Sequence, residues 1–176
     1  IIGASQNEPT ISAIQADTEK EAHSIMEKLF TEKAIDAAVT MHYPFPIGVS
    51  TVGRIIAPGK GKQVYIATTT GTSSTDRLEG MVKNTIYGII AAKSCGIKNP
   101  TVGILNIEGA RQTEIVLKKL KQNGYDISFA TSKRADGGMI MRGNDLLSGA
   151  ADVMVADSLT GNLMVKIFSA YTTGGN

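Results

Sequence analysis

The sequence has a single cysteine, no tryptophan and no long apolar run, and each of these limits the classes of protein to which it can belong. One cysteine cannot form a disulfide within the chain, so a reducing cytoplasm is the expected location. No stretch approaches the roughly 20 apolar residues of a membrane-spanning helix. The formal charge of +2 gives no strong attraction to polyanions. We therefore expect neither nucleic acid nor a membrane as a partner.

The length and composition favour one domain. The 176 residues are 42% hydrophobic, which is enough for a sizeable core, and we expect a single α/β domain over residues 1–176. The chain begins with Ile1 rather than Met, and Asn176 closely follows an apolar segment. We therefore expect a fragment of a longer chain that lacks its N- and C-terminal parts.

Helix and strand patterns alternate along the chain. Apolar residues at intervals of three and four predict helices at residues 17–33, 76–94, 110–122 and 163–171. Short apolar runs predict strands at residues 37–41, 49–56, 63–68, 101–107, 127–131 and 152–156. The strands are apolar on both sides, which is typical of strands buried between two layers of helices. The predicted fold class is therefore α/β, with a mostly parallel sheet flanked by helices.

Ligands of such sheets gather outside the carboxyl ends of the strands, and four polar clusters follow predicted strands there. The first is His42 with Tyr43, after the run at residues 37–41. A lone histidine is usually structural, but a position at the end of a strand also suits a functional one. His23, on the first helix, is expected to be solvated.

The second cluster, "TTTGTSSTDR" at residues 68–77, lies between a predicted strand and a predicted helix. Small hydroxyl residues and Gly71 let backbone N–H groups point at an anion, and the helix that follows adds its positive end. Arg77 could add a bidentate contact. The alternative is an ordinary loop in which Ser74 or Thr75 caps the helix. The stretch matches neither the Walker A nor the dinucleotide-binding pattern.

The third cluster is "MRGNDLLSG" at residues 141–149, in which Arg142, Asn144 and Asp145 surround one glycine. This turn could present a cation and two acceptors to a ligand, but an Arg–Asp pair that braces a loop fits equally well. The single cysteine, Cys95, is predicted to be a buried structural thiol. It lies in the last turn of its helix, where the dipole disfavours the thiolate.

The fourth cluster follows the last predicted strand. Asp157 comes directly after it, and Thr160, Gly161 and Asn162 open the final helix. A helix cap explains one residue, Ser158 or Thr160. A single cap leaves Asp157 and Asn162 unexplained, and we interpret these two residues as candidates for a reaction site.

Four motifs carry a resemblance to a known family. "IYGIIAAKSCGIKNPTVGILNI" and "RGNDLLSGAADVMVADSLTGNLMVK" resemble the PlsX family of acyl-carrier-protein:phosphate acyltransferases. With "MHYPFPIGVSTVGR" and "YIATTTGTS" included, the resemblance is closer to the alpha subunits of component C of glycine/sarcosine/betaine reductase complexes. It extends over essentially the whole chain.

The resemblance implies the fold of isocitrate and isopropylmalate dehydrogenases, which phosphate acetyltransferases share. It also implies a reaction without a cofactor, in which inorganic phosphate attacks an acetyl thioester and releases acetyl phosphate. The implied partners are a component C beta subunit and a selenoprotein carrier, and related folds usually form dimers. Two alternatives stay open: a phosphate acyltransferase that uses acyl-carrier-protein or coenzyme A thioesters, and a non-catalytic docking fragment.

The resemblance also implies roles for residues. Asp157, Thr160, Gly161 and Asn162 match the family motif position by position, whereas Arg142 and Asp145 match it loosely. The family lysine has no counterpart in residues 68–77, and the acetyl-carrying cysteine is expected beyond Asn176. No metal is expected. The predicted catalytic residues are His42, Asn162 and Asp157, with His42 as the base that deprotonates monohydrogen phosphate. The predicted substrate and phosphate-binding residues are Thr69, Thr70, Gly71, Thr72, Arg77, Arg142, Asn144, Asp145, Thr160 and Gly161.

Overall fold

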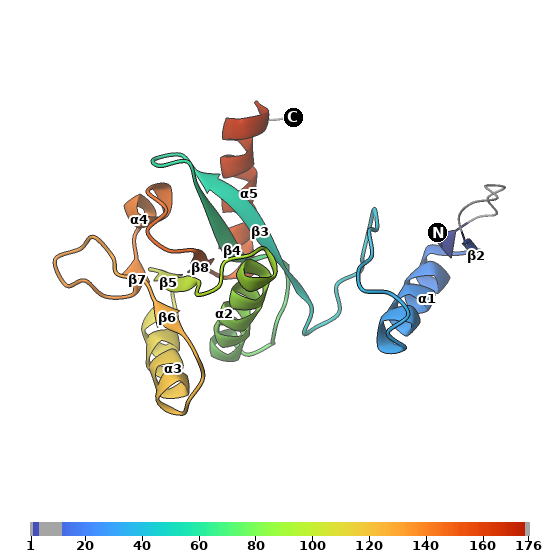
Figure 1. Cartoon of the computed structure of the whole chain (residues 1–176), viewed down its shortest axis with the longest axis horizontal. Helices are drawn as coiled ribbons and strands as arrows, with labels where there is room; N and C mark the ends of the chain where they lie inside the picture. Colours follow the sequence, from blue (N-terminus) through green and yellow to red (C-terminus); the bar gives the residue numbers. More distant parts are fainter. Residues whose placement is uncertain (1, 4–11, 175–176) are drawn as a thin grey trace. The chain divides into compact units, whose positions relative to one another are not determined.

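The structure, a computed structural model, describes residues 2–3 and 12–174. The chain divides into two compact units, Ile1–Pro44 and Phe45–Asn176 (Figure 1). Each unit has its own helices and strands. The single domain expected over residues 1–176 stays a prediction.

The N-terminal unit contains helix α1 (Glu19–Thr31) and two short parallel strands, β1 (Ile2–Gly3) and β2 (Ile14–Gln15). The helix begins at its cap Thr18, whose side chain accepts a hydrogen bond from the N–H of Glu21 at 3.2 Å. The predicted helix is confirmed, although its apolar residues are not buried. None of residues 19–31, all of which the structure describes, is buried, because the described part of this unit has too few residues to cover them.

The strand predicted at residues 37–41 is also wrong. These residues form an irregular segment in which Val39 and Met41 are fully exposed. A strand needs a hydrogen-bonded neighbour. Within the residues of this unit that the structure describes, β1 and β2 pair only with each other. Residues 37–41 therefore have the composition of a strand, but in the described part of this unit they pair with no other strand.

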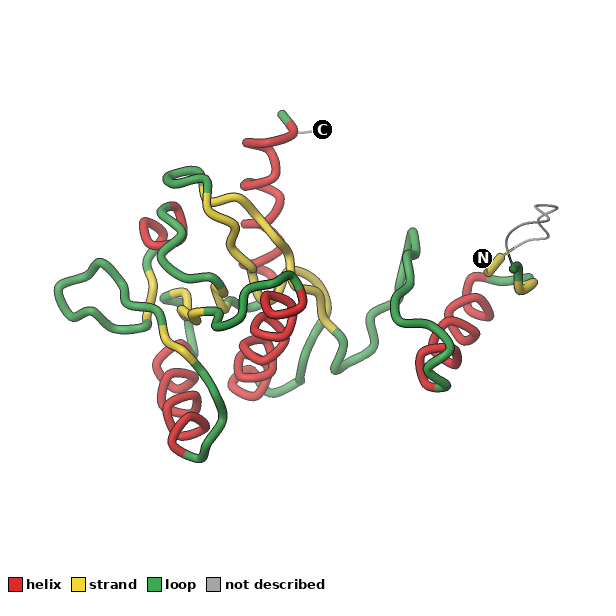
Figure 2. Tube along the Cα trace, viewed as in Figure 1, coloured by secondary structure: helices red, strands yellow, loops and turns green. Residues whose placement is uncertain are grey.

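The C-terminal unit is built on a six-stranded sheet (Figure 2). Its order is β3-β4-β8-β5-β6, and β7 pairs with β5. Among the described strands β3 runs antiparallel to β4, and the other pairs are parallel. The predicted class, a mostly parallel sheet flanked by helices, is confirmed. The strands are β3 (Ser50–Ala57), β4 (Lys62–Gly71), β5 (Thr101–Leu105), β6 (Ser128–Phe129), β7 (Ile140–Met141) and β8 (Val153–Val155).

Helices cover both faces of this sheet. Helices α2 and α3 contact each other and pack on one face, where Ala67 and Val153 point. Helix α5 packs on the other face (Figure 1). Phe168 belongs there to the same buried cluster as Ile66 and Met154. No helix in the described part of the chain is both long and apolar enough to cross a membrane. The helices are α2 (Arg77–Ser94), α3 (Ala110–Gln122), α4 (Gly143–Leu147) and α5 (Ser158–Thr173).

Two glycines let the long helices approach the sheet. A Cβ atom at Gly88 of α2 would lie 2.4 Å from Cγ1 of Val153, and one at Gly161 of α5 would lie 1.8 Å from the carbonyl oxygen of Thr68. Neither distance is tolerable, so a larger side chain would push the helix away. Gly161 therefore has a packing function, and its predicted role as a binding residue stays a prediction.

The helix ends differ from the predictions in two places. Helix α5 begins at Ser158, five residues before the predicted start, because its cap lies directly after β8. Cys95 is the residue at the C-terminal cap of α2, as its predicted place in the last turn suggests, but it is exposed. The prediction of a buried thiol is wrong, because the periodicity of a helix does not determine how its last turn is covered.

Candidate functional site

The candidate site lies where the parallel strands end. Strands β4, β8 and β5 are neighbours, so their carboxyl ends meet at one edge of the sheet. A cavity of about 200 Å³ lies beside the ends of β4 and β8 and the first residues of α2 and α5. Six of the twelve described residues that line it carry a hydroxyl group. The lining residues are Thr68, Gly71, Thr72, Ser73, Ser74, Thr75, Arg77, Gly80, Met81, Asn84, Asp157 and Ser158.

Arg77 connects the segments that follow the three strands. Its Nε donates a hydrogen bond to the carbonyl oxygen of Glu108, after β5, at 3.1 Å. Its Nη2 lies 3.5 Å from Oδ2 of Asp157, after β8, and its Nη1 lies 3.8 Å from Oε2 of Glu108. The side chain is 48% exposed. The guanidinium is therefore positioned at the cavity and still accessible to an anion.

Asp157 is the N-terminal cap of α5. Its Oδ1 accepts a hydrogen bond from the N–H of Thr160 and its Oδ2 accepts one from the Thr160 hydroxyl, both at 2.9 Å. The prediction that Ser158 or Thr160 caps this helix is wrong. A carboxylate suits the position because it also interacts favourably with the positive end of the helix. Capping thus explains Asp157 and Thr160 without a ligand, although Asp157 also lines the cavity.

Helix α2 begins in the same way. Asp76 accepts a hydrogen bond from the N–H of Glu79 at 2.7 Å, so the cap is neither Ser74 nor Thr75 as predicted. The Ser74 hydroxyl instead donates to the Glu79 carboxylate at 2.8 Å. Both helices that border the cavity therefore start at an aspartate, and both direct their N-terminal ends at the same edge of the sheet.

The threonine-rich stretch is a strand for longer than predicted. Strand β4 continues to Gly71, and Thr70 and Gly71 pair with Thr51 and Ser50 of β3. The strand was predicted to end at residue 68, so the prediction is wrong for residues 69–71, where β-branched threonines favour a strand. Thr72 lies in the turn that follows and lines the cavity.

Asn162 joins α5 to this strand. Its Nδ2 donates hydrogen bonds to the carbonyl oxygen of Thr69 at 2.8 Å and to the hydroxyl of Thr70 at 3.3 Å. The structure therefore brings Asn162, Thr69 and Thr70 together, as a site built from both motifs requires. Asn162 itself is half-buried.

Ser73 and Asn84 are among the lining residues that were not predicted as site residues. Ser73 and Asn84 are both buried, and the Ser73 hydroxyl donates to Oδ1 of Asn84. The Nδ2 of Asn84 donates to the carbonyl oxygen of Ala156 at 3.0 Å, and Ser50 lies 2.8 Å from the Ser73 hydroxyl. The signal for Asn84 was its place one turn from Met81 on the apolar face of α2.

The third predicted cluster lies elsewhere. Asp145 is only 3% exposed and accepts hydrogen bonds from the Ser132 hydroxyl and from the N–H groups of Lys133 and Arg142, at 2.7 to 3.0 Å. Burial alone would raise the pKa of Asp145, but the hydrogen bonds from Arg142, Lys133 and Ser132 outweigh it and hold the pKa below its ordinary value. Arg142, Asn144 and Asp145 are not among the described residues that line the cavity, and their phosphate-binding role stays a prediction.

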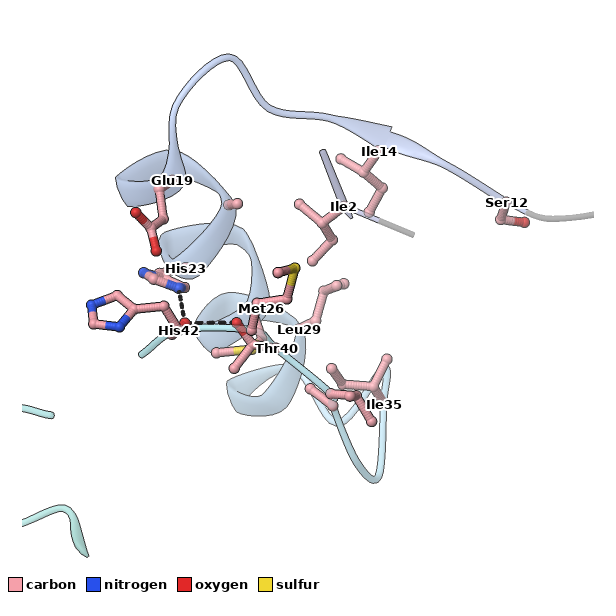
Figure 3. Close-up of a pocket in the computed structure, with 14 residues that line it drawn as sticks. Ile2, Ser12, Ile14, Glu19, His23, Met26, Leu29, Ile35, Thr40 and His42 are labelled. Atoms are coloured by element: carbon pink, nitrogen blue, oxygen red, sulfur yellow. Dashed lines mark hydrogen bonds between the residues drawn. The ribbon is translucent and has the colours of Figure 1, made fainter. Parts of the chain in front are cut away.

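His42 belongs to the N-terminal unit. There an apolar cavity of about 580 Å³ lies between α1 and residues 35–42 (Figure 3). The Nε2 of His23 donates to the carbonyl oxygen of His42 at 2.7 Å, so His23 is half-buried and bonded rather than solvated as predicted. Figure 3 shows the exposed His42 ring pointing away from the apolar side chains such as Met26 and Leu29. The role of His42 as a base stays a prediction.

The groups around the C-terminal cavity are suited to an oxyanion. Helix N-terminal ends, hydroxyl groups and one guanidinium are the donors that bind phosphate in proteins. Within the described residues, no three His, Cys, Asp or Glu side chains are grouped so that they could hold a metal ion. The chemistry available from these side chains is hydrogen bonding and charge.

Comparison with known proteins gives three matches that bear on this site. An alpha subunit of component C of the glycine/sarcosine/betaine reductase complex, from Peptoclostridium acidaminophilum, is 63% identical over 169 residues, which cover 96% of this chain and 44% of that protein. The phosphate acyltransferase of Thermosipho melanesiensis is 35% identical over 86 residues, covering 46% and 23%. That of Thermotoga maritima is 27% identical over 156 residues, covering 79% and 45%. The chain thus spans less than half the length of these relatives.

A family model described as "Fatty acid synthesis protein" matches residues 2–176. The resemblance to component C alpha subunits and to phosphate acyltransferases, predicted from the motifs, is confirmed by these matches. The matched residues include all of the cavity wall and both helices that border it. The chain belongs to the fatty acid synthesis protein family.

Proposed function

We propose that this chain supplies the phosphate-binding part of a phosphate acyltransferase. In the reaction a phosphate oxygen forms a bond to the carbonyl carbon of an acyl thioester, the carbon–sulfur bond breaks, and the thiolate leaves. The observation that carries the proposal is the cavity at the ends of β4 and β8, lined by hydroxyl groups and by Arg77. Relatives that carry the name phosphate acyltransferase support the reaction class.

The N-terminal ends of α2 and α5 give the cavity its anion preference. Each helix ends in N–H groups without partners in the helix, and each dipole is positive at this end. Arg77 is the one cationic side chain among the described residues that line the cavity. Its contacts with Glu108 and Asp157 hold the guanidinium in place, so little side-chain entropy is lost when an anion binds.

Asn162 acts in this proposal as a positioning residue. Both hydrogens of its amide group are used, one by the carbonyl oxygen of Thr69 and one by the Thr70 hydroxyl. An amide whose hydrogens are committed cannot donate to an oxyanion as well. Asn162 therefore serves the site by holding the first turn of α5 against the end of β4.

The acyl donor follows from the most similar of these relatives. The 63% identity to a component C alpha subunit, against 27% to 35% for the two phosphate acyltransferases, favours an enzyme-bound acetyl thioester, with acetyl phosphate as the product. A beta subunit and a selenoprotein carrier are the proposed partners. The second candidate is a transferase that uses acyl-carrier-protein or coenzyme A thioesters. This second candidate is supported by the two relatives that carry the name phosphate acyltransferase.

Arsenate separates these candidates, because acyl arsenates hydrolyse at once and reveal any thioester that is attacked. The intact protein should cleave the carrier-bound acetyl thioester in an arsenate-dependent reaction, and acyl-carrier-protein and coenzyme A thioesters more slowly. Equal cleavage of all three would favour the second candidate. No arsenate-dependent cleavage in the presence of the partner subunits would favour a docking fragment instead.

Substitution of Arg77 tests the site itself. Arg77→Lys keeps the charge but loses the planar fork, and it should lower kcat/KM for phosphate about 10- to 100-fold. Arg111→Lys is the matched control, because Arg111 is an exposed residue on α3 that pairs with Glu114 and does not line the cavity. Phosphate dependence that is the same in both variants would contradict the proposed site.

A further inference from the structure

The hydrogen bonds behind the cavity wall have a fixed direction. The Asn84 amide nitrogen must face the carbonyl oxygen of Ala156, so its oxygen faces Ser73. An amide oxygen can only accept, so the Ser73 hydroxyl donates its one hydrogen to Asn84. In the hydrogen bond between Ser50 and Ser73, the donor must then be Ser50. Ser73 is one of the lining residues, and it has no hydrogen to offer a ligand. Towards a ligand it can act only as an acceptor.

Asp157 is a second acceptor in the same wall. A carboxylate has about four lone-pair sites, and three of them face the Thr160 N–H, the Thr160 hydroxyl and the Arg77 guanidinium. One site is left for a ligand. The side chain is 25% exposed, so a ligand can reach it.

The charges of the wall are balanced. Arg77 and Asp157 are the charged residues among the described side chains that line the cavity, one positive and one negative. Two further carboxylates contact lining residues, Glu108 at Arg77 and Glu79 at Ser74, and Lys83 offsets Glu79. A ligand whose oxygens can only accept would face Asp157 without a hydrogen between them.

We propose that this cavity selects an oxyanion that carries a proton, such as monohydrogen phosphate, and discriminates against sulfate. The P–OH group donates its single proton to Asp157, with Ser73 as the alternative acceptor, while the remaining oxygens accept from Arg77 and from the helix ends. Sulfate has the same shape and charge but no proton, so its oxygen would meet the carboxylate directly. The inference rests on the proposed function, because it specifies which form of phosphate that site holds.

Calorimetric titration of the intact protein with potassium phosphate and with potassium sulfate tests the proposal. At mildly alkaline pH both ligands are dianions, so their charge is matched. The wild type should bind phosphate about 10-fold or more tightly than sulfate, the ratio expected for one hydrogen bond to a charged acceptor. Equal binding of the two anions would overturn the inference and leave the proposed phosphate site standing.

Asp157→Asn is the decisive variant. Asparagine caps helices as well as aspartate does, so α5 should be retained. The amide oxygen must still accept from the N–H of Thr160, so it takes the place of Oδ1, and the site left for a ligand is then on a neutral oxygen, which is a weaker acceptor than a carboxylate. The phosphate-to-sulfate ratio should therefore fall about 10-fold. A ratio that stays at the wild-type value would overturn the assignment of Asp157.

Asp76→Asn is the matched control. Asp76 also caps a helix at this edge, it precedes Arg77 directly, and it is not a lining residue. The substitution removes the same charge, so it should strengthen the binding of both anions and leave their ratio unchanged. A fall in the ratio equal to that of Asp157→Asn would show that charge alone matters and would overturn the inference. Binding of neither anion by the wild type would overturn the proposed function together with it.

Discussion

Asp157 and Asp145 both hold the start of a helix that follows a strand of the same sheet, yet their surroundings differ. Asp157 accepts hydrogen bonds from Thr160 within its own helix, and its carboxylate is open to a cavity. Asp145 is buried and accepts hydrogen bonds from Ser132 and Lys133 on another segment as well as from the N–H of Arg142. Each carboxylate faces three donors, but the Asp157 side chain is 25% exposed and Asp145 only 3% exposed, so of the two only Asp157 can be reached by a ligand. We call Asp157, Thr160 and Asn162 the open cluster, and Arg142, Asn144 and Asp145 the closed cluster.

The difference shows which feature distinguishes a site from a brace. Both clusters follow strands and both combine an arginine, an asparagine and an aspartate. The helix after β8 has sixteen residues, whereas the helix after β7 has five, so only the first has a substantial dipole. An accessible carboxylate, a long helix and the cavity occur together at Asp157. Polar residues that follow a strand are therefore insufficient evidence for a site unless these three features accompany them.

The largest expected effect comes from Gly161→Ala, which would disrupt the packing of α5 against β4 beside the open cluster. The added Cβ would lie 1.8 Å from the carbonyl oxygen of Thr68, so α5 must move or the strand must distort. We expect the free energy of unfolding to fall by about 3 kcal/mol, together with the loss of phosphate binding. Urea unfolding of the intact protein measures the first effect and calorimetry the second.

Gly143→Ala is the control for this substitution. Gly143 opens α4 in the closed cluster, and a Cβ there would meet nothing within 4 Å. Its expected effect on the free energy of unfolding is within about 0.5 kcal/mol. Similar losses at the two glycines would contradict the tight contact between α5 and β4.

Asp145→Asn tests the closed cluster. The variant keeps the shape of the side chain but loses the charge that three donors surround, so the free energy of unfolding should fall by about 2 kcal/mol. Phosphate affinity should stay at the wild-type value. Reduced phosphate affinity in a folded variant would show that Asp145 belongs to the binding site after all.

The same carboxylate predicts a dependence on pH. The pKa of Asp145 is lower in the folded protein than its ordinary value, so the charged form stabilises the fold. This contribution is fully present above the ordinary pKa and is lost as the pH falls through the lower, folded pKa. The difference in unfolding free energy between wild type and Asp145→Asn should therefore shrink in acid. A difference that grows as the pH falls would contradict the direction of the shift.

A smaller effect is expected from Asn162→Ala. The loss of the hydrogen bonds to Thr69 and Thr70 should lower the free energy of unfolding by about 1 kcal/mol and slow acyl phosphate formation about 10-fold. Ser169→Ala, in the same helix, loses one hydrogen bond to the Lys166 carbonyl and should leave turnover unchanged. Full turnover by Asn162→Ala would remove Asn162 from the site.

Much of the fold of the C-terminal unit could be predicted because its periodicity is strong. Residues 110–122 were predicted as a helix and form α3, and the apolar runs form neighbouring parallel strands. The N-terminal unit could not be predicted as well. The run at residues 37–41 has the composition of a strand, but a strand also needs a partner, and local sequence does not contain that information.

The helix starts show a second limit. Residues Ser74, Thr75 and Asp76 all favour a cap, as do Asp157, Ser158 and Thr160, so propensity alone cannot choose among them. The choice depends on where the preceding strand ends, which its pairing with β3 and β5 decides. The motif at residues 157–162 follows a strand, as the sequence predicted, and its role in a site stays a prediction, whereas Ser73 and Asn84 became visible only through their buried hydrogen bonds.

The central claim is that phosphate binds at the open cluster rather than at the closed one. Chemical-shift mapping of backbone amides during a phosphate titration of the intact protein tests it most directly. We predict that the largest shifts occur at residues 72–75 and 158–160, at the starts of α2 and α5, and that residues 132–145 stay unchanged. Shifts centred on Asp145 and its donors, or no shifts at the two helix starts, would contradict the account.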